Sequence, residues 1–208
     1  MLIVALTGGI ATGKSVVARV LEEKGCFVQN ADVVAHELMN PGQEIWAALI
    51  RHFGQKILNE DQSINRKKLG EIIFKNPQER DFLNELTHPR ILKKIKETIA
   101  QLEKSGRYEI YITEAPLVIE SGYHYIYDRL ILTYCQPEIQ LSRLCQRDRI
   151  TPAQALRIIK AQTTNEEKIP YADYLIETSG SLAQTIEQAE QIYFNLFQDS
   201  MLKKAGQL

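Results

Sequence analysis

Eight residues near the start of the chain have the types and the spacing that bind the phosphates of a nucleotide. The pattern G-x-x-x-x-G-K-S/T is matched by the run Gly8-Gly9-Ile10-Ala11-Thr12-Gly13-Lys14-Ser15. In such a loop the backbone N–H groups point inward at phosphate oxygens. We therefore expect Lys14 to reach the β- and γ-phosphates, and the Ser15 hydroxyl to bind Mg²⁺.

The residues on either side of this loop indicate a strand before it and a helix after it. The apolar run 2–6 has the length and β-branched content of a buried strand, and residues 16–23 have a helical pattern. A helix that begins at the loop also directs the positive end of its dipole at the phosphates. The alternative is a glycine turn with an exposed lysine, which would require neither neighbour.

Three acids lie at or beyond the ends of the strands that the sequence predicts at 26–29 and 108–114. Asp32 lies just past the first strand, where a carboxylate can accept the proton of an attacking hydroxyl. It could instead be the N-cap of a helix predicted at 33–39. Glu114 ends the second strand and could hold the hydration shell of Mg²⁺, or be a helix cap or a surface acid. Glu120 lies in the loop that follows.

Arginines late in the chain are candidates for stabilising the transferred phosphoryl group. Arg143 and Arg147 are four positions apart and share a face of a helix predicted from Pro137 to about residue 148. Arg157 lies on the next predicted helix, which Thr151 should cap. Guanidinium groups bind the charge that develops in phosphoryl transfer. The hairpin 138–162 follows a strand predicted at 129–134, where kinases with such a loop carry a lid. The alternative is a solvated helix whose arginines pair with neighbouring acids.

A long region without predicted strands lies between the strands predicted at 26–29 and 108–114. Helical patterns cover 44–53 and 66–74, and a further helix begins at Asn76-Pro77, should break at His88-Pro89 and resumes over 91–102. Such a block suggests a separate lobe or cap. A phosphate-rich acceptor would explain its basic residues, although a solvated helix face would explain the lysines as well and a lone histidine is more often a core or capping residue. The basic residues are Arg66, Lys67, Lys68, His88 and Arg90.

Strands that alternate with helices predict an α/β fold with a parallel sheet covered on both faces. Ligands then bind at the carboxyl ends of the strands. A last strand is expected at 173–177, followed by a closing amphipathic helix at 181–197. The residues expected to face inward from that helix are Leu182, Ile186, Ala189, Ile192, Tyr193 and Leu196.

The composition restricts the partners of the protein. A formal net charge of −1 over 208 residues provides no global field for nucleic acid or an anionic membrane. No apolar stretch is long enough to span a bilayer, and the first strand begins at once, which leaves no room for a charged leader. Cys26, Cys135 and Cys145 lack the spacing of a metal site or a disulfide framework. We therefore expect a cytoplasmic protein with reduced thiols.

Together these features resemble the dephospho-coenzyme A kinase family over about residues 2–197. The segments that carry the resemblance are Leu6-Thr7-Gly8-Gly9-Ile10 running into Gly13-Lys14-Ser15, Ala31-Asp32, Asn65-Arg66, Leu83-Asn84, His88-Pro89, Pro116-Leu117 with Glu120, and Arg143 with Gln146-Arg147-Asp148. The resemblance implies a single P-loop kinase domain with a three-layer core like that of the nucleoside monophosphate kinases. The core would comprise about 1–32, 106–137 and 166–208, with a helical acceptor-binding lobe at 33–105 and a helical lid at 138–165.

The resemblance also implies an activity and a set of site residues. The reaction would be transfer of phosphate from ATP, with Mg²⁺, to the ribose 3′-hydroxyl of dephospho-coenzyme A. Thr7, Lys14, Asp32 and Arg143 would be catalytic, and Asp32 would be the base. The expected nucleotide contacts are Gly8, Gly9, Ala11, Thr12, Gly13, Lys14, Ser15, Val16 and Arg147. The expected acceptor contacts are Asp32, Arg66, His88, Pro116 and Glu120, and the expected metal contacts are Ser15 and Glu114.

The chain departs from the family pattern at several positions. Asn30 replaces an aspartate, Val16 replaces a threonine beside the metal ligand, and Thr178 with Ser179 replaces an asparagine before a glycine. Ala11 replaces a glycine and is expected to require an ordinary negative φ.

Two other functions stay open. One is a P-loop kinase for another small hydroxyl or nucleoside monophosphate, and the other is a GTP-dependent switch. The N-K-x-D motif that such a switch would show is absent. A monomer is the favoured state.

Overall fold

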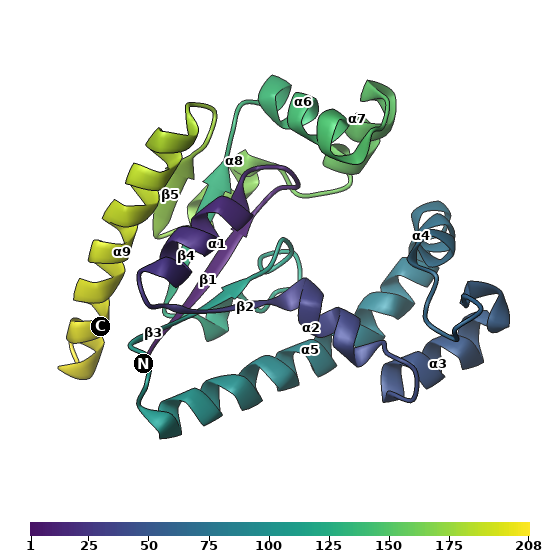
Figure 1. Ribbon diagram of the computed structural model, residues 1–208, viewed down its shortest axis with the longest axis horizontal. Coiled ribbons are helices and arrows are strands. Elements are labelled where there is room, and N and C mark those ends of the chain that lie inside the picture. The colour runs from purple at the N-terminus through teal and green to yellow at the C-terminus, as the bar shows by residue number, and fades with distance from the viewer. The chain divides into compact units, whose positions relative to one another are not determined.

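A five-stranded sheet is the central feature of the computed structural model, which describes all 208 residues (Figure 1). The sheet has the order β2-β3-β1-β4-β5. Its central strand, β1, pairs in parallel with β3 and with β4, and β4 pairs in parallel with β5. The prediction of a parallel α/β sheet is confirmed. The strand bounds are β1 Leu2–Gly8, β2 Phe27–Asn30, β3 Ile110–Glu114, β4 Arg129–Tyr134 and β5 Tyr174–Glu177.

The chain divides into two compact units, of which the first contains most of the sheet. This unit comprises Met1–Gln29 and Gln101–Leu208. Its helices are α1 Lys14–Glu23, α6 Pro137–Asp148, α7 Pro152–Lys160, α8 Asn165–Lys168 and α9 Leu182–Lys204, and it has 3₁₀ turns at His124–Ile126 and Ile169–Tyr171. In Figure 1, α9 runs beside β5, and α6 and α7 form the hairpin that the sequence predicts.

The core of the first unit lies on both faces of β1. Leu2, Val4 and Leu6 belong to a buried cluster with side chains of α1 and α9, whereas Ala5 belongs to a second cluster with Leu130 and Leu132 of β4. This alternation follows from the two-residue period of a strand. Because β1 is buried on both faces, its sequence is a continuous apolar run rather than an alternating one.

The second unit is helical and comprises Asn30–Ala100. Its helices are α2 Ala31–Leu38, α3 Glu44–Phe53, α4 Arg66–Lys75 and most of α5 Pro77–Ser105, with a 3₁₀ turn at Gln55–Ile57. A separate core forms here around Ile45, Leu49 and Ile57, which are almost completely buried. No helix of either unit combines the length and apolar character that a membrane span requires.

The helix break that the sequence predicts at His88-Pro89 is wrong, because α5 continues through Pro89. A proline inside a helix removes one backbone bond and costs about 3 kcal/mol or more. Packing offsets this cost, because Phe82, Leu83 and Leu86 pack against the core of the second unit.

Three other details in the C-terminal part of the chain differ from expectation. Leu182 does not face inward, because 62% of its surface is exposed at the first position of α9. The closing helix also continues to Lys204, past the predicted end at 197, and the short helix α8 was not predicted.

Candidate active site

The phosphate loop closes at the carboxyl end of β1 and leads directly into α1. Gly13 is the N-cap of α1 and has φ 84°, in the left-handed region, and no side chain caps the helix. The first turn of α1 therefore faces the loop without a side-chain acceptor, as an anion site requires. Gly8 has φ 150°, and a Cβ there would lie 2.3 Å from Thr133 Oγ1 and 2.4 Å from its carbonyl oxygen. Only glycine fits at this position.

Ala11 does not have the negative φ that the sequence led us to expect. Its φ is 61°, in the left-handed region. The curl of the loop requires this conformation whichever residue is present, and an L-residue with a Cβ adopts it at a cost of about 1–2 kcal/mol. The alanine therefore fits the loop but strains it.

The side chain of Lys14 folds back over the phosphate loop. Its Nζ donates to the carbonyl oxygens of Gly8 and Gly9, each at 2.9 Å. The ammonium group is thus held at the loop, where it can bind phosphate oxygens. The next residue, Ser15, is exposed in the first turn of α1.

Two glutamines that the sequence analysis did not single out hold the loop from outside. Gln140 of α6 donates from Nε2 to the carbonyl oxygen of Ile10 at 2.8 Å, and the Ile10 N–H donates to Gln162 Oε1 at 2.8 Å. A Cβ on Gly9 would lie 2.8 Å from Gln140 Nε2, which accounts for this glycine. In one sequence nothing distinguishes these glutamines from those on a solvated helix face.

The residues predicted after β1 and β3 lie on neighbouring segments. Thr7 is fully buried, and its hydroxyl donates to the carbonyl oxygen of Pro116 at 3.3 Å. Glu114 is partly buried at the end of β3, in register with Leu6 of β1. The two strand ends therefore meet beside the phosphate loop.

Glu120 pairs with a lysine that the sequence analysis missed. Its Oε1 lies 2.7 Å from the Nζ of Lys168, whose side chain is fully buried at the end of α8. The angle of this contact is poor for a hydrogen bond, so the interaction is mainly between the two charges. A buried lysine requires such a partner. The lysine stands among charged residues, which gives no sign that it is buried.

The two candidate arginines of α6 have different partners. Arg143 donates from Nη2 to the carbonyl oxygen of Thr178 at 2.6 Å and from Nη1 to its hydroxyl at 3.1 Å. Arg147 forms a two-bond pair with the adjacent Asp148, at 2.7 and 3.1 Å, which raises the pKa of the arginine and lowers that of the aspartate. Arg157 is exposed on α7.

In the second unit, Asp32 lies in the first turn of α2 but does not cap it. The cap is Asn30, whose Oδ1 accepts from the N–H groups of Asp32 at 2.9 Å and of Val33 at 3.1 Å. The N-cap alternative for Asp32 is therefore wrong. The departure at Asn30 has a structural function, and the exposed carboxylate of Asp32 does not serve as the cap.

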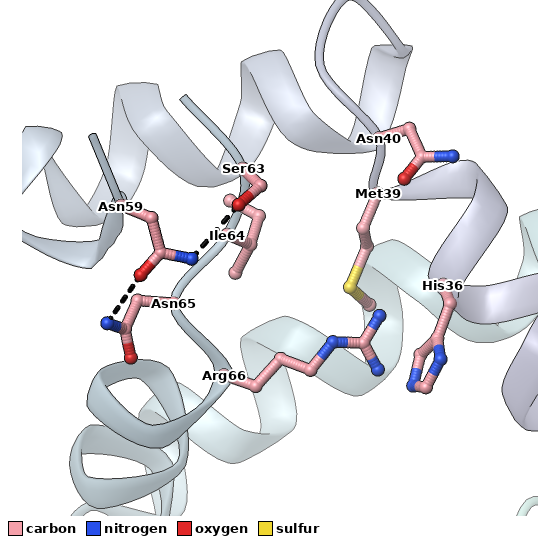
Figure 2. Close-up of a pocket in the computed structure, with 8 residues that line it drawn as sticks. All are labelled: His36, Met39, Asn40, Asn59, Ser63, Ile64, Asn65 and Arg66. Atoms are coloured by element: carbon pink, nitrogen blue, oxygen red, sulfur yellow. Dashed lines mark hydrogen bonds between the residues drawn. The ribbon is translucent and has the colours of Figure 1, made fainter. Parts of the chain in front are cut away.

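A cavity of about 360 Å³ lies in the second unit, and Arg66 lines it. Figure 2 shows the guanidinium group of Arg66 between the side chains of Met39 and His36. The opposite wall is held by hydrogen bonds from Asn65 Nδ2 to Asn59 Oδ1 at 2.7 Å and from Asn59 Nδ2 to Ser63 Oγ at 2.9 Å. The lining residues are His36, Met39, Asn40, Asn59, Ser63, Ile64, Asn65 and Arg66.

The charges around this cavity interact with one another. Burial and the charge of Arg66 lower the pKa of His36, and the Asp32 carboxylate opposes them. Burial also lowers the pKa of Arg66, again opposed by Asp32. The cavity thus presents a cation and a titratable imidazole near an acid, and the cation suits an anionic ligand.

The other basic residues of the predicted lobe do not line this cavity. His88 is half-buried, and burial lowers its pKa. Arg90 pairs with Glu44 and also donates to the carbonyl oxygen of Leu86 at 2.8 Å. Of the predicted basic set, Arg66 therefore lines this cavity, whereas Lys68 lines a different one together with the acids Glu60 and Asp61.

A parallel sheet whose central strand ends in a phosphate loop, followed at once by a helix, defines the class of P-loop nucleotide-binding proteins. Within that class the family is shown by the sequence. The family model of dephospho-CoA kinase matches residues 2–184, and the chain belongs to this family.

Individual relatives agree with the family match. A dephospho-CoA kinase domain-containing protein of Danio rerio is 41% identical over 198 residues, which cover 94% of this chain and 86% of that protein. A dephospho-CoA kinase of Carboxydothermus hydrogenoformans is 40% identical over 186 residues, 89% of this chain and 90% of the relative.

Solved structures give the same result. Dephospho-CoA kinase from Campylobacter jejuni has a TM-score of 0.70 and 29% identity, with 95% of this chain and 98% of that chain covered. Shikimate kinase from Acinetobacter baumannii has a TM-score of 0.53 at 18% identity, covering 96% of this chain and 94% of that chain, and this likeness shows the fold alone.

Proposed function

We propose that this protein transfers the γ-phosphoryl group of ATP to the ribose 3′-hydroxyl of dephospho-coenzyme A, which is the last step of coenzyme A synthesis. The family match over residues 2–184 carries the proposal. The phosphate loop, with Gly13 as the left-handed N-cap of α1 and Lys14 held against the loop, supports a triphosphate donor.

On the donor side, the loop amides and Lys14 bind the β- and γ-phosphates. Ser15 and Glu114 are the proposed contacts of Mg²⁺. The protein has no cluster of three or more side chains that could bind a metal ion together. Mg²⁺ keeps several waters and binds through one or two protein groups together with substrate phosphates. The ion would neutralise charge that develops on the phosphate oxygens.

On the acceptor side, Asp32 accepts the proton of the 3′-hydroxyl as that oxygen attacks phosphorus. Arg66 binds the anionic diphosphate of dephospho-coenzyme A at the cavity that it lines with His36. This cavity contains the polar groups that such a substrate needs, because Asn59, Ser63 and Asn65 also line it.

Arg143 stabilises the negative charge of the transferring phosphoryl group, and Thr7 supports the loop from β1. The roles of Arg147 in nucleotide binding and of His88, Pro116 and Glu120 in acceptor binding remain predictions. The cytoplasmic location and the monomeric state are predictions of the same kind.

The deciding experiment is a coupled assay of ADP release with purified protein and a panel of acceptors. We expect turnover with dephospho-coenzyme A and not with nucleoside monophosphates or shikimate. Turnover with one of the latter, and none with dephospho-coenzyme A, would establish the alternative of a P-loop kinase for another acceptor. Slow hydrolysis of GTP without any acceptor would instead indicate a switch.

A matched pair of variants tests the proposed base. Asp32→Asn should lower kcat by about 100-fold or more while ATP still binds, because a positioned base contributes about 10²–10⁴ in rate. Asp81→Asn makes the same change at another exposed aspartate of the second unit and should leave turnover as it was. Unchanged turnover in Asp32→Asn would remove this residue from the mechanism.

A further inference from the structure

Thr178 connects the phosphate loop to the lid arginine within the first unit. It directly follows β5, and only 1% of its surface is exposed. Its Oγ1 lies 3.0 Å from the carbonyl oxygen of Thr12 in the phosphate loop and 3.2 Å from that of Tyr134 at the end of β4. The same oxygen accepts from Arg143 Nη1 at 3.1 Å, and the carbonyl oxygen of Thr178 accepts from Arg143 Nη2 at 2.6 Å.

The hydrogen-bonding capacity of a hydroxyl group fits this arrangement. A threonine hydroxyl has one proton and two lone pairs. It donates the proton to the carbonyl oxygen of Thr12 or of Tyr134, and a lone pair accepts from the guanidinium group. The methyl group lies beside the loop, 3.5 Å from the position that a Cβ on Gly13 would take.

The guanidinium group is thereby fixed at two points. Arginine has a long side chain with many rotamers, and a planar fork that binds two acceptors at once limits them. Two N–H groups of Arg143 bond to Thr178, and a guanidinium group has five. The others can bind phosphate oxygens without loss of the anchoring bonds.

We propose that Thr178 is a positioning residue that sets Arg143 against the phosphate loop for phosphoryl transfer. This inference rests on the proposed function, because it requires Arg143 to act on the transferring group. Donors that are held in place before the reaction need no reorganisation when charge develops, and this is the advantage that Thr178 provides.

The test combines conservative variants with a double-mutant cycle. Thr178→Val removes the hydroxyl group and should lower kcat about tenfold, which is the usual effect of losing one hydrogen bond to a charged group. Thr178→Ser retains the hydroxyl group and should stay within about twofold of the unchanged protein. The matched control is Thr185→Val in α9, where a buried threonine bonds to Ser181 of its own helix, and its kcat should not change.

The cycle separates positioning from a general structural role. In the background of Arg143→Ala, Thr178→Val should reduce kcat by less than about twofold, because the residue through which it acts is absent. If Thr178→Val lowered kcat equally in both backgrounds, the inference would be overturned. Full activity of Thr178→Val or of Arg143→Ala would also overturn it, as would a kcat of Thr178→Ser as low as that of Thr178→Val. Melting temperatures verify folding, and Thr178→Ala replaces the valine variant if the latter does not fold.

The cycle is measured with whichever acceptor the panel identifies. Absence of turnover with dephospho-coenzyme A would therefore refute the proposed function, while the two backgrounds still decide the role of Thr178.

Discussion

Replacing Ala11 with glycine is expected to make the protein more stable. Ala11 has φ 61° within the phosphate loop, where a side chain with a Cβ is strained. Glycine adopts this conformation without penalty. The substitution therefore removes strain from the folded protein and leaves the course of the loop as it is.

The magnitude follows from two opposing contributions. A Cβ in the left-handed region costs about 1–2 kcal/mol, and this cost disappears in the variant. Glycine also increases the conformational entropy of the unfolded chain, which lowers the free energy of unfolding by about 0.4–1 kcal/mol. The free energy of unfolding should rise by about 1 kcal/mol. For a protein of this size that raises Tm by about 2–4 °C.

Thermal unfolding followed by circular dichroism measures the change. Ala18→Gly is the matched control, because it makes the same substitution in α1, where Ala18 is buried and helical. A glycine inside a helix costs about 0.5–1 kcal/mol, so this variant should melt at a lower temperature than the unchanged protein. If Ala11→Gly lowered Tm as Ala18→Gly does, strain at Ala11 would not be the cause and the reasoning would be refuted.

Three further predictions concern the loop glycines, one histidine and one buried lysine. Gly8→Ala should weaken ATP binding, measured by calorimetry, more than Gly9→Ala, because a Cβ at Gly8 meets backbone and one at Gly9 meets a side chain that can move; equal losses would contradict this. Burial lowers the pKa of His88 from 6.5, so the free energy of unfolding should be highest above pH 6.5 and fall as the pH drops below it, and it should fall less in His88→Gln. Denaturant titrations at pH 7 and 5.5 would disprove this if both proteins lost the same free energy of unfolding between the two pH values. Lys168→Met should lower Tm by several degrees, because it leaves Glu120 without its cation, and Glu120→Gln in addition should recover part of the loss; no recovery in the double variant would count against the pair.

The phosphate loop and the strands that surround it could be predicted because their signals are local. A strand buried on both faces is a continuous apolar run, and the loop needs glycine where a Cβ would meet Thr133. The helices of the second unit could also be predicted from their periodicity, and Asn65 caps α4 by accepting from the Lys68 N–H.

The features that the sequence did not reveal depend on partners far away in the chain. Pro89 predicts a helix break, but the packing of residues on either side of it outweighs the lost backbone bond. The φ of Ala11 depends on the curl of the loop and not on the preference of alanine. Lys168 is buried because Glu120, 48 positions earlier, is beside it, and no local pattern contains that information.

The pair of bonds at Ile10 restricts how the α6–α7 hairpin can swing. Gln140 lies in the first turn of α6 and Gln162 lies just past α7, so both ends of the hairpin are bonded to Ile10, and a swing about these two bonds would have to release Arg143 from Thr178. A body hinged at two neighbouring points rotates about the line through them. Its greatest travel is then at the far tip, around Arg149, while the parts nearest the hinge scarcely shift. A swinging hairpin would thus sweep its tip through solvent while Ile10, to which both glutamines bond, stays in place.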